Sequence, residues 1–191
     1  MSSTPDRFKN NFMALIEICE ELVSEGHEHG ATTLTPVMFS MIRIIASKLS
    51  SEYLIERFIS KTHRHWKNIK DRDLEYFKDL GVTLMSIASK EVIDSMVDGE
   101  DSVISGLKCS HVSAFKDLLV AEYKDENGEM VSLLDDERIA DTWRIMHSFV
   151  KQSIAYIYEK RCVVDGEFTK DFFSEINVKT CAKDWNIRKY M

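Results

Sequence analysis

Hydrophobic residues recur every three or four positions along most of this chain, and polar residues occupy the positions between them. This period is typical of α-helices that turn one face toward a protein core. The first such stretch predicts a helix over residues 5–24, which begins with a proline after a threonine and ends near Gly26 and Gly30. Its apolar stripe consists of Phe8, Phe12, Leu15, Cys19 and Leu22.

Three further stretches set the expected architecture. Residues 36–49 are apolar on nearly every side, so we predict a helix at the centre of the fold. Residues 74–97 predict an amphipathic helix with Gly81 in its middle, where a glycine permits close approach of a bulky group. Residues 136–161 predict the longest helix, with an acidic first turn and a basic last turn that suit the helix dipole. Its seam consists of Ile139, Trp143, Met146, Val150, Ile154 and Ile157.

The loops complete this picture. Residues 125–128, Asp-Glu-Asn-Gly, are a strong turn signal, but their flanks alternate poorly and favour a turn over a β-hairpin. We therefore predict an all-α bundle of about seven or eight helices that forms a single domain over residues 1–178. Residues 179–191 combine basic residues with Trp185 and Tyr190, which makes them a candidate docking tail. The alternative is a tail that folds onto its own domain.

Composition narrows the class of protein. The chain has 191 residues, of which 44% are hydrophobic and 30% charged, the balance of a globular protein. Its net charge of −7 argues against general nucleic-acid binding. Its four cysteines are widely spaced, which indicates reduced thiols. We find neither a signal peptide nor an apolar stretch of about twenty residues, so we expect a cytoplasmic protein without a transmembrane segment.

Four segments together resemble a known family. Residues 77–85, Phe-Lys-Asp-Leu-Gly-Val-Thr-Leu-Met, look like the long distal helix of a globin. Residues 107–111, Leu-Lys-Cys-Ser-His, are similar to the globin segment that ends in the proximal histidine. Residues 136–157 resemble the last globin helix, with Trp143 at an often aromatic position, and residues 41–58 resemble the second helix and the phenylalanine after it. The likeness covers about residues 36–160.

The resemblance implies a haem site. His111 would be the proximal iron ligand, and Phe58 would lie against the face of the haem. Leu80 would occupy the distal position, and Leu84 would lie one turn on, over the iron. Ser110 would orient the imidazole or meet a propionate. The implied function is that of a haem protein that binds a diatomic gas for sensing, redox chemistry or transport.

One departure from the family changes the expected ligand chemistry. Many globins carry histidine or glutamine where this chain has Leu80. With Ile44 also expected in the pocket, the distal side would be apolar and would offer a bound gas little polar help. We therefore expect weak oxygen stabilisation and readier binding of carbon monoxide or nitric oxide.

A basic segment suggests a different function. Residues 61–72 hold five cations and one acid. If the chain binds haem, Arg64 or Lys67 would pair with a haem propionate. The segment could instead bind nucleic-acid phosphate or an acidic protein. The alternative is a solvated face with Trp66 packed inward. The cations are Lys61, Arg64, Lys67, Lys70 and Arg72.

Other candidate chemistry is weaker. The pairs His27/His29 and His63/His65 lack a third metal ligand in the sequence, whereas zinc needs three or four. His147 is expected at the edge of the core. Cys109 next to the predicted proximal histidine could suggest a thiol enzyme, but no base or oxyanion site accompanies it. No nucleotide-binding or hydrolase motif occurs, so we identify no catalytic residues.

Three hypotheses follow for the function. The first is the globin-like haem protein. The second is a non-enzymatic helical protein that acts through protein–protein contacts or self-association. The third is a nucleic-acid-binding protein that uses residues 61–72, which the net charge disfavours.

Overall fold

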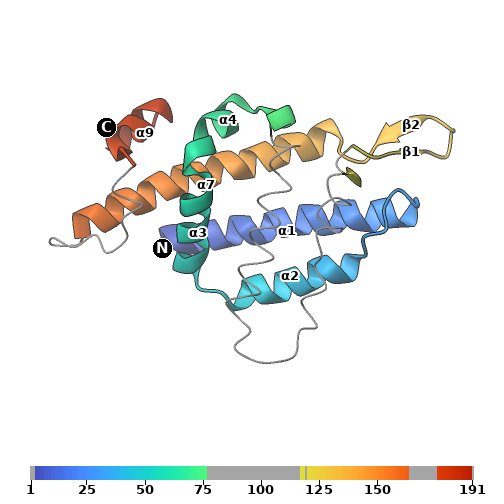
Figure 1. The fold of residues 1–191 in the computed structure, drawn as a ribbon, viewed down its shortest axis with the longest axis horizontal. Helices are drawn as coiled ribbons and strands as arrows, with labels where there is room; N and C mark the ends of the chain where they lie inside the picture. The colour runs from blue at the N-terminus through green and yellow to red at the C-terminus, as the bar shows by residue number, and fades with distance from the viewer. Residues whose placement is uncertain (1–2, 77–116, 119, 164–175, 191) are drawn as a thin grey trace. The chain divides into compact units, whose positions relative to one another are not determined.

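The computed structural model describes residues 3–76, 117–118, 120–163 and 176–190, and these residues are mostly helical (Figure 1). The elements, in chain order, are α1 (Thr4–Glu28), α2 (Pro36–Lys48), α3 (Ser51–Thr62), the 3-10 helix η1 (His63–His65), α4 (Trp66–Asp71), β1 (Glu122–Lys124), β2 (Met130–Ser132), α7 (Asp136–Val163), α9 (Val178–Asp184) and the 3-10 helix η2 (Arg188–Tyr190). The prediction of a mainly helical chain is confirmed.

The chain separates into two compact units, and each is described by itself. Unit 1 consists of residues 1–15, 47–72 and 141–191. Unit 2 consists of residues 16–46 and 73–140. The two longest described helices, α1 and α7, each contribute residues to both units.

Unit 1 has an aromatic core. The Phe149 ring on α7 lies 4.5 Å from the Phe8 ring of α1 and 5.2 Å from the Phe58 ring of α3, measured between ring centroids. Phe8 and Phe58 also contact each other at 5.4 Å. Tilted rings at these separations attract one another beyond the area that they bury. The buried residues around them include Ile55, Ile59, Trp66, Ile69, Trp143, Val150, Ile154 and Ile157.

Polar contacts at the start of α1 reinforce this core. The Lys9 ammonium donates to the carbonyls of Ser47 and Leu49, at 2.8 and 2.6 Å. These carbonyls lie at the end of α2, where a helix leaves its last carbonyls without backbone partners. The side chain of Asn11 donates to the Ser148 hydroxyl of α7 at 2.8 Å. The first half of α1 is thereby tied to α7 and to the C-terminal end of α2.

Unit 2 has a separate aliphatic core. Its fully or nearly fully buried side chains come from α1, from the loop after it, from α2 and from the segments that flank the strands. They are Leu22, Val23, Leu34, Phe39, Leu118 and Leu133. The core extends the stripe predicted from Phe8 to Leu22, but α1 runs on to Glu28 instead of stopping near Gly26.

Gly26 does not end α1, whereas Gly30, the other glycine predicted to end it, follows the helix with a φ of 68°. A Cβ at Gly26 would lie 2.5 Å from a methyl of Leu118 and 3.1 Å from a methyl of Leu133. Gly26 therefore lies inside the helix and lets neighbouring side chains approach its backbone closely. It does not end the helix. Two buried leucines fill the space that a side chain would need.

We expect Gly26→Ala to destabilise the protein in spite of alanine's better helix propensity. The added methyl must displace Leu118, which is fully buried and has little room to move. Overpacking costs about 1–3 kcal/mol, against a propensity gain of up to about 1 kcal/mol. Urea denaturation should show a net loss, whereas the neighbouring exposed control His27→Ala should change stability little. A more stable Gly26→Ala variant would contradict this packing.

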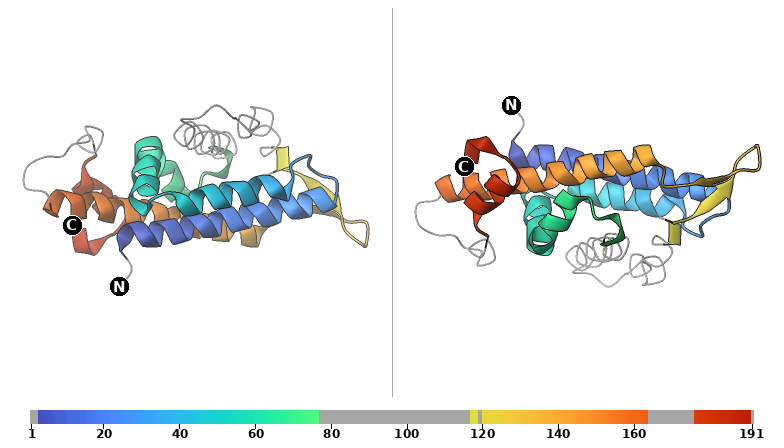
Figure 2. Two further views of the ribbon diagram at one scale, coloured as in Figure 1. Left: turned by 90° about the horizontal axis from the view of Figure 1, so that it is seen from below. Right: turned by 90° about the horizontal axis from the view of Figure 1, so that it is seen from above.

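The expectation that the fold surrounds residues 36–49 is wrong on one side. A seam of Phe39, Ile42 and Ala46 is buried or partly buried. At its flank the Ser40 hydroxyl donates to Glu20 at 2.6 Å, and Arg43 pairs with Glu17 at 2.8 Å, so α2 lies beside α1 (Figure 2). The apolar stripe on the side of α2 opposite this seam is exposed: Val37 is 65%, Met41 39% and Ile44 55% exposed.

A short hairpin replaces the simple turn that we expected at residues 125–128. β1 and β2 pair antiparallel, with Tyr123 opposite Val131. The carboxylate of Asp125 accepts hydrogen bonds from the backbone N–H groups of Asn127 and Glu129, and Gly128 has a φ of 81° that favours glycine. Each strand has only three residues, so the alternation was too short to recognise in the sequence.

Within the described ranges, no helix combines the length and the apolar character that crossing a bilayer requires.

Candidate functional site

His147 on α7 joins three elements of unit 1. Its Nε2–H donates to the backbone carbonyl of Ile69 in α4 at 2.9 Å. Its ring meets the Trp185 indole, at the end of α9, edge to face with a centroid distance of 5.3 Å. Figure 1 shows α4 and α9 on the same side of α7. The predicted basic segment and the predicted tail, which are far apart in the sequence, therefore meet at one histidine.

The charges around this junction are mostly positive. Burial lowers the pKa of His147, the hydrogen bond to Ile69 opposes this effect, and the nearby charges of Arg72 and Lys151 lower the pKa further. A half-buried imidazole between two cations favours its neutral form. We use the name basic surface for six exposed cations, which lie on α4, at its C-terminal cap, on α7 and on α9: Lys67, Lys70, Arg72, Lys151, Lys179 and Lys183.

These cations are available to an anion. Lys67, Lys70, Lys151 and Lys183 form no ion pair with a carboxylate in the part of the chain that the structure describes. Two acids, Asp71 and Asp184, lie on the same short helices and are also exposed. The cations remain in excess, so the surface attracts carboxylates or phosphates from solution.

The two units differ strongly in charge. Unit 1 contains 18 Lys and Arg against 11 Asp and Glu, a net charge of +7. Unit 2 contains 7 Lys and Arg against 21 Asp and Glu, a net charge of −14. Their sum is the overall −7 of the chain. The acidic average therefore hides a basic unit.

We expect His147 to make stability depend on pH. Its folded pKa lies below that of the unfolded chain, which is about 6.5 for histidine. Below about pH 6.5 the unfolded state binds more protons, so the free energy of unfolding falls as the pH drops. His147→Gln keeps an N–H donor for Ile69 without titrating, and its stability should fall less between about pH 7 and pH 5. Denaturant titrations with the same pH slope for both proteins would contradict this role.

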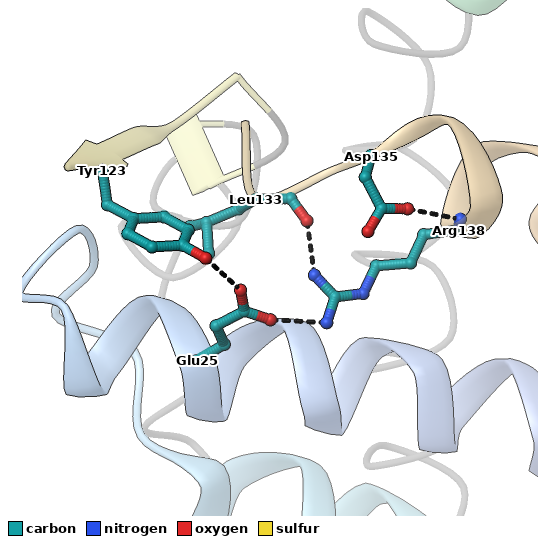
Figure 3. A network of polar contacts seen from close by, with 5 residues as sticks. All are labelled: Glu25, Tyr123, Leu133, Asp135 and Arg138. Carbon is teal, nitrogen blue, oxygen red and sulfur yellow. Dashed lines mark hydrogen bonds and ion pairs between the residues drawn. The ribbon is translucent and has the colours of Figure 1, made fainter. Parts of the chain in front are cut away.

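Unit 2 contains a different polar cluster, drawn in Figure 3. The Tyr123 hydroxyl of β1 donates to one carboxylate oxygen of Glu25 at 3.0 Å, and Arg138 pairs with the other oxygen. The same guanidinium donates to the carbonyl of Leu133 at 2.6 Å. At the start of α7, the Asp135 carboxylate accepts from the backbone N–H of Arg138 at 2.7 Å.

This cluster fastens the hairpin to α1. Its carboxylate and guanidinium are both about a quarter exposed, so the pair is only partly screened by water. The hydrogen bond to Glu25 raises the pKa of Tyr123, which keeps the phenol protonated as a donor. The His29 ring stacks on the Tyr123 ring at a centroid distance of 3.9 Å. Every polar group here has a partner within the cluster, which is typical of a structural clamp.

The other described histidines and the Cys19 thiol offer neither a metal site nor an activated nucleophile. In the described ranges, no three His, Cys, Asp or Glu side chains gather as metal ligands would. Burial lowers the pKa of His65, and the charges of His63 and Arg64 lower it further. Burial raises the pKa of the free Cys19 thiol to about 12, so this thiol is not a nucleophile near neutral pH.

Most of the predicted haem site falls outside the described residues. Leu80, Leu84, Ser110 and His111 all lie there, and Phe58 is described. The Phe58 ring packs on Phe8 and Phe149 within the aromatic core of unit 1.

The apolar pocket has one further described member. Ile44, which we expected to line that pocket, is 55% exposed.

The sequence contained a signal for the junction that we missed. His147 was expected at the edge of the core and is half-buried there. Lys151 lies four residues later on the same helix, and residues four apart share a helix face. A histidine and a lysine on the polar border of the longest seam could thus have marked this surface.

Comparison with known proteins adds no relative. No family model, no curated protein and no solved structure matches this chain.

Proposed function

We propose that this chain is a non-enzymatic helical docking protein, which binds an acidic segment of a protein partner on the basic surface of unit 1. The observation that supports the proposal is the junction at His147, where α4, α7 and the tail converge with their exposed cations. This arrangement combines two segments that the sequence had marked separately as docking candidates. Four of the exposed cations on these elements, Lys67, Lys70, Lys151 and Lys183, form no ion pair in the described ranges, so they can meet an anion.

Charge favours an acidic peptide over nucleic acid. A nucleic acid is a long polyanion, and most of its length would be repelled by a chain of net charge −7. A short acidic segment needs only the local field of the basic surface. That field extends about 8 Å at physiological ionic strength. The attraction can therefore act on a partner that covers unit 1 alone.

The first test compares three labelled probes by fluorescence anisotropy at low salt. They are an acidic peptide of Glu and Asp, a glutamine peptide of equal length, and a single-stranded DNA oligonucleotide. We expect the acidic peptide to bind and the glutamine peptide not to bind. The oligonucleotide should bind more weakly than the acidic peptide. Tighter binding of the oligonucleotide, or no binding of the acidic peptide, would overturn the proposal.

A haem-binding, globin-like function is the second proposal, and the sequence alone supports it. The run Leu80-Gly81-Val82 and the histidine at position 111 carry the resemblance. A haem held by His111 would supply an iron that binds a diatomic gas.

The haem proposal has a direct spectroscopic test. Protein titrated with haem should show a Soret band that shifts when carbon monoxide is added to the reduced form. His111→Ala should abolish or greatly weaken haem retention, because the iron loses its only predicted axial ligand. Full retention with an unchanged spectrum would rule out His111 as the ligand. A protein without any Soret band after titration would rule out the haem function.

A further inference from the structure

The hairpin region of unit 2 is an exposed acidic projection. Residues 120–137 carry seven carboxylates against one lysine, a net charge of −6. We call this segment the acidic hairpin. Six of the seven acidic residues are exposed, among them Glu122 and Glu126. Val120 and Met130 add two apolar side chains that are 56% and 58% exposed.

The acidic hairpin is held in a fixed shape. Tyr123 and Arg138 fasten it to Glu25, and the Asp125 carboxylate orders its turn (Figure 3). A rigid projection loses little conformational freedom when it binds, which favours association. Its charges are thus presented on a preformed surface.

We infer that the acidic hairpin of one copy docks on the basic surface of a second copy of this chain. The inference rests on the proposed function, because it names the acidic partner of that surface. Charge complementarity carries it, since the cations at the His147 junction and the carboxylates of the hairpin are both exposed. Lysine stems also pack well on apolar side chains such as Val120 and Met130.

The proposed contact is not symmetric between the two copies. The two partner surfaces are different, so the interface is heterologous and leaves one free surface of each kind at the ends of a pair. Further copies can add to these ends. The assembly should therefore grow with protein concentration and should dissolve as salt screens the charges.

Light scattering and sedimentation of the full chain test the inference. At about 0.05 M salt the average mass should rise above the 22.1 kDa of one chain as the concentration increases. At about 1 M salt, where the Debye length is about 3 Å, the mass should return to that of one chain. A wild-type protein that remains monomeric at low salt would overturn the inference.

Two charge reversals identify the surfaces. The hairpin variant carries Glu122→Lys and Glu126→Lys, and the basic variant carries Lys70→Glu and Lys151→Glu. These side chains are exposed, so the melting temperatures should not change. Each variant alone should stay monomeric. A variant that self-associates as the wild type does would contradict the role of its surface.

Mixing the variants gives the sharpest result. The hairpin variant keeps an intact basic surface, and the basic variant keeps an intact hairpin. The wild-type contact can therefore form between them, and a mixture should associate under conditions in which each variant alone stays monomeric. A mixture that remains monomeric would overturn the heterologous contact.

The self-association and peptide-binding measurements together distinguish a failure of this inference from a failure of the proposed function. If the wild type does not self-associate but still binds the acidic peptide on its basic surface, only the self-association is wrong. If it neither self-associates nor binds the peptide, both are wrong.

Discussion

Replacing Phe149 with alanine should lower the free energy of unfolding by about 3–5 kcal/mol, the usual cost of truncating a buried phenylalanine. Phe149 is 1% exposed and contacts the rings of Phe8, Phe12 and Phe58. The variant loses the transfer energy of the ring, and the stiff helices around it cannot close the cavity fully. Its neighbours also lose the aromatic attraction that tilted rings provide.

Thermal and urea unfolding measure this loss. Each kcal/mol corresponds to about 2–4 °C of melting temperature at this chain length, so the decrease should be about 10 °C or more. Phe149→Leu is the matched control, because it refills most of the volume and should cost much less. A Phe149→Ala variant with nearly unchanged stability would show that α1, α3 and α7 do not share this core.

Reversing two charges of the basic surface should weaken the binding of an acidic peptide about tenfold or more, which corresponds to about 1.4 kcal/mol. Lys70→Glu and Lys151→Glu change the local charge by four units on two of the elements that meet at His147. Each reversal replaces an attraction to the peptide by a repulsion of similar size. Exposed charge pairs contribute a few tenths to 1 kcal/mol each, so their combined effect should reach this range.

A control variant separates local charge from net charge. Lys48→Glu with Lys124→Glu changes the net charge equally, but neither residue belongs to the basic surface. This control should retain most of the affinity. If both variants weaken the peptide equally, the overall charge of the chain governs binding and the basic surface has no special role.

The sequence predicted which segments are helical better than it predicted which residues pack around each helix. The stripe from Phe8 to Leu22 and the seam through Trp143 and Val150 both correspond to buried faces, because a spacing of three and four reports a helix face directly. Gly26 was misread, since a glycine in a sequence marks either a stop or a packing gap. Only the position of Leu118, about ninety residues later, distinguishes the two.

Long-range pairing also explains the other errors. The apolar character of residues 36–49 predicted a surrounded helix, but Ser40 and Arg43 pair with carboxylates of α1 and turn Met41 outward. The hairpin depends on Tyr123 reaching Glu25, a contact across about a hundred residues. Periodicity within a segment carries no information on such contacts.

For the candidate site too, the sequence identified the segments but not the contacts between them. The sequence marked the basic residues of segment 61–72 and the tail as separate candidates, from composition alone. It could not place them together, because His147, Ile69 and Trp185 become neighbours only through the tertiary fold. The predicted haem residues other than Phe58 lie outside the described residues, so that reading stays a prediction.

The most direct test of the docking function is the dissociation constant of the acidic peptide, measured on the wild-type chain over a series of salt concentrations. If the basic surface binds the peptide through its exposed cations, affinity should fall steadily as salt rises from about 0.05 M to about 1 M, because screening shortens the reach of those charges. Affinity that does not change with salt, or no binding even at the lowest concentration, would contradict the account.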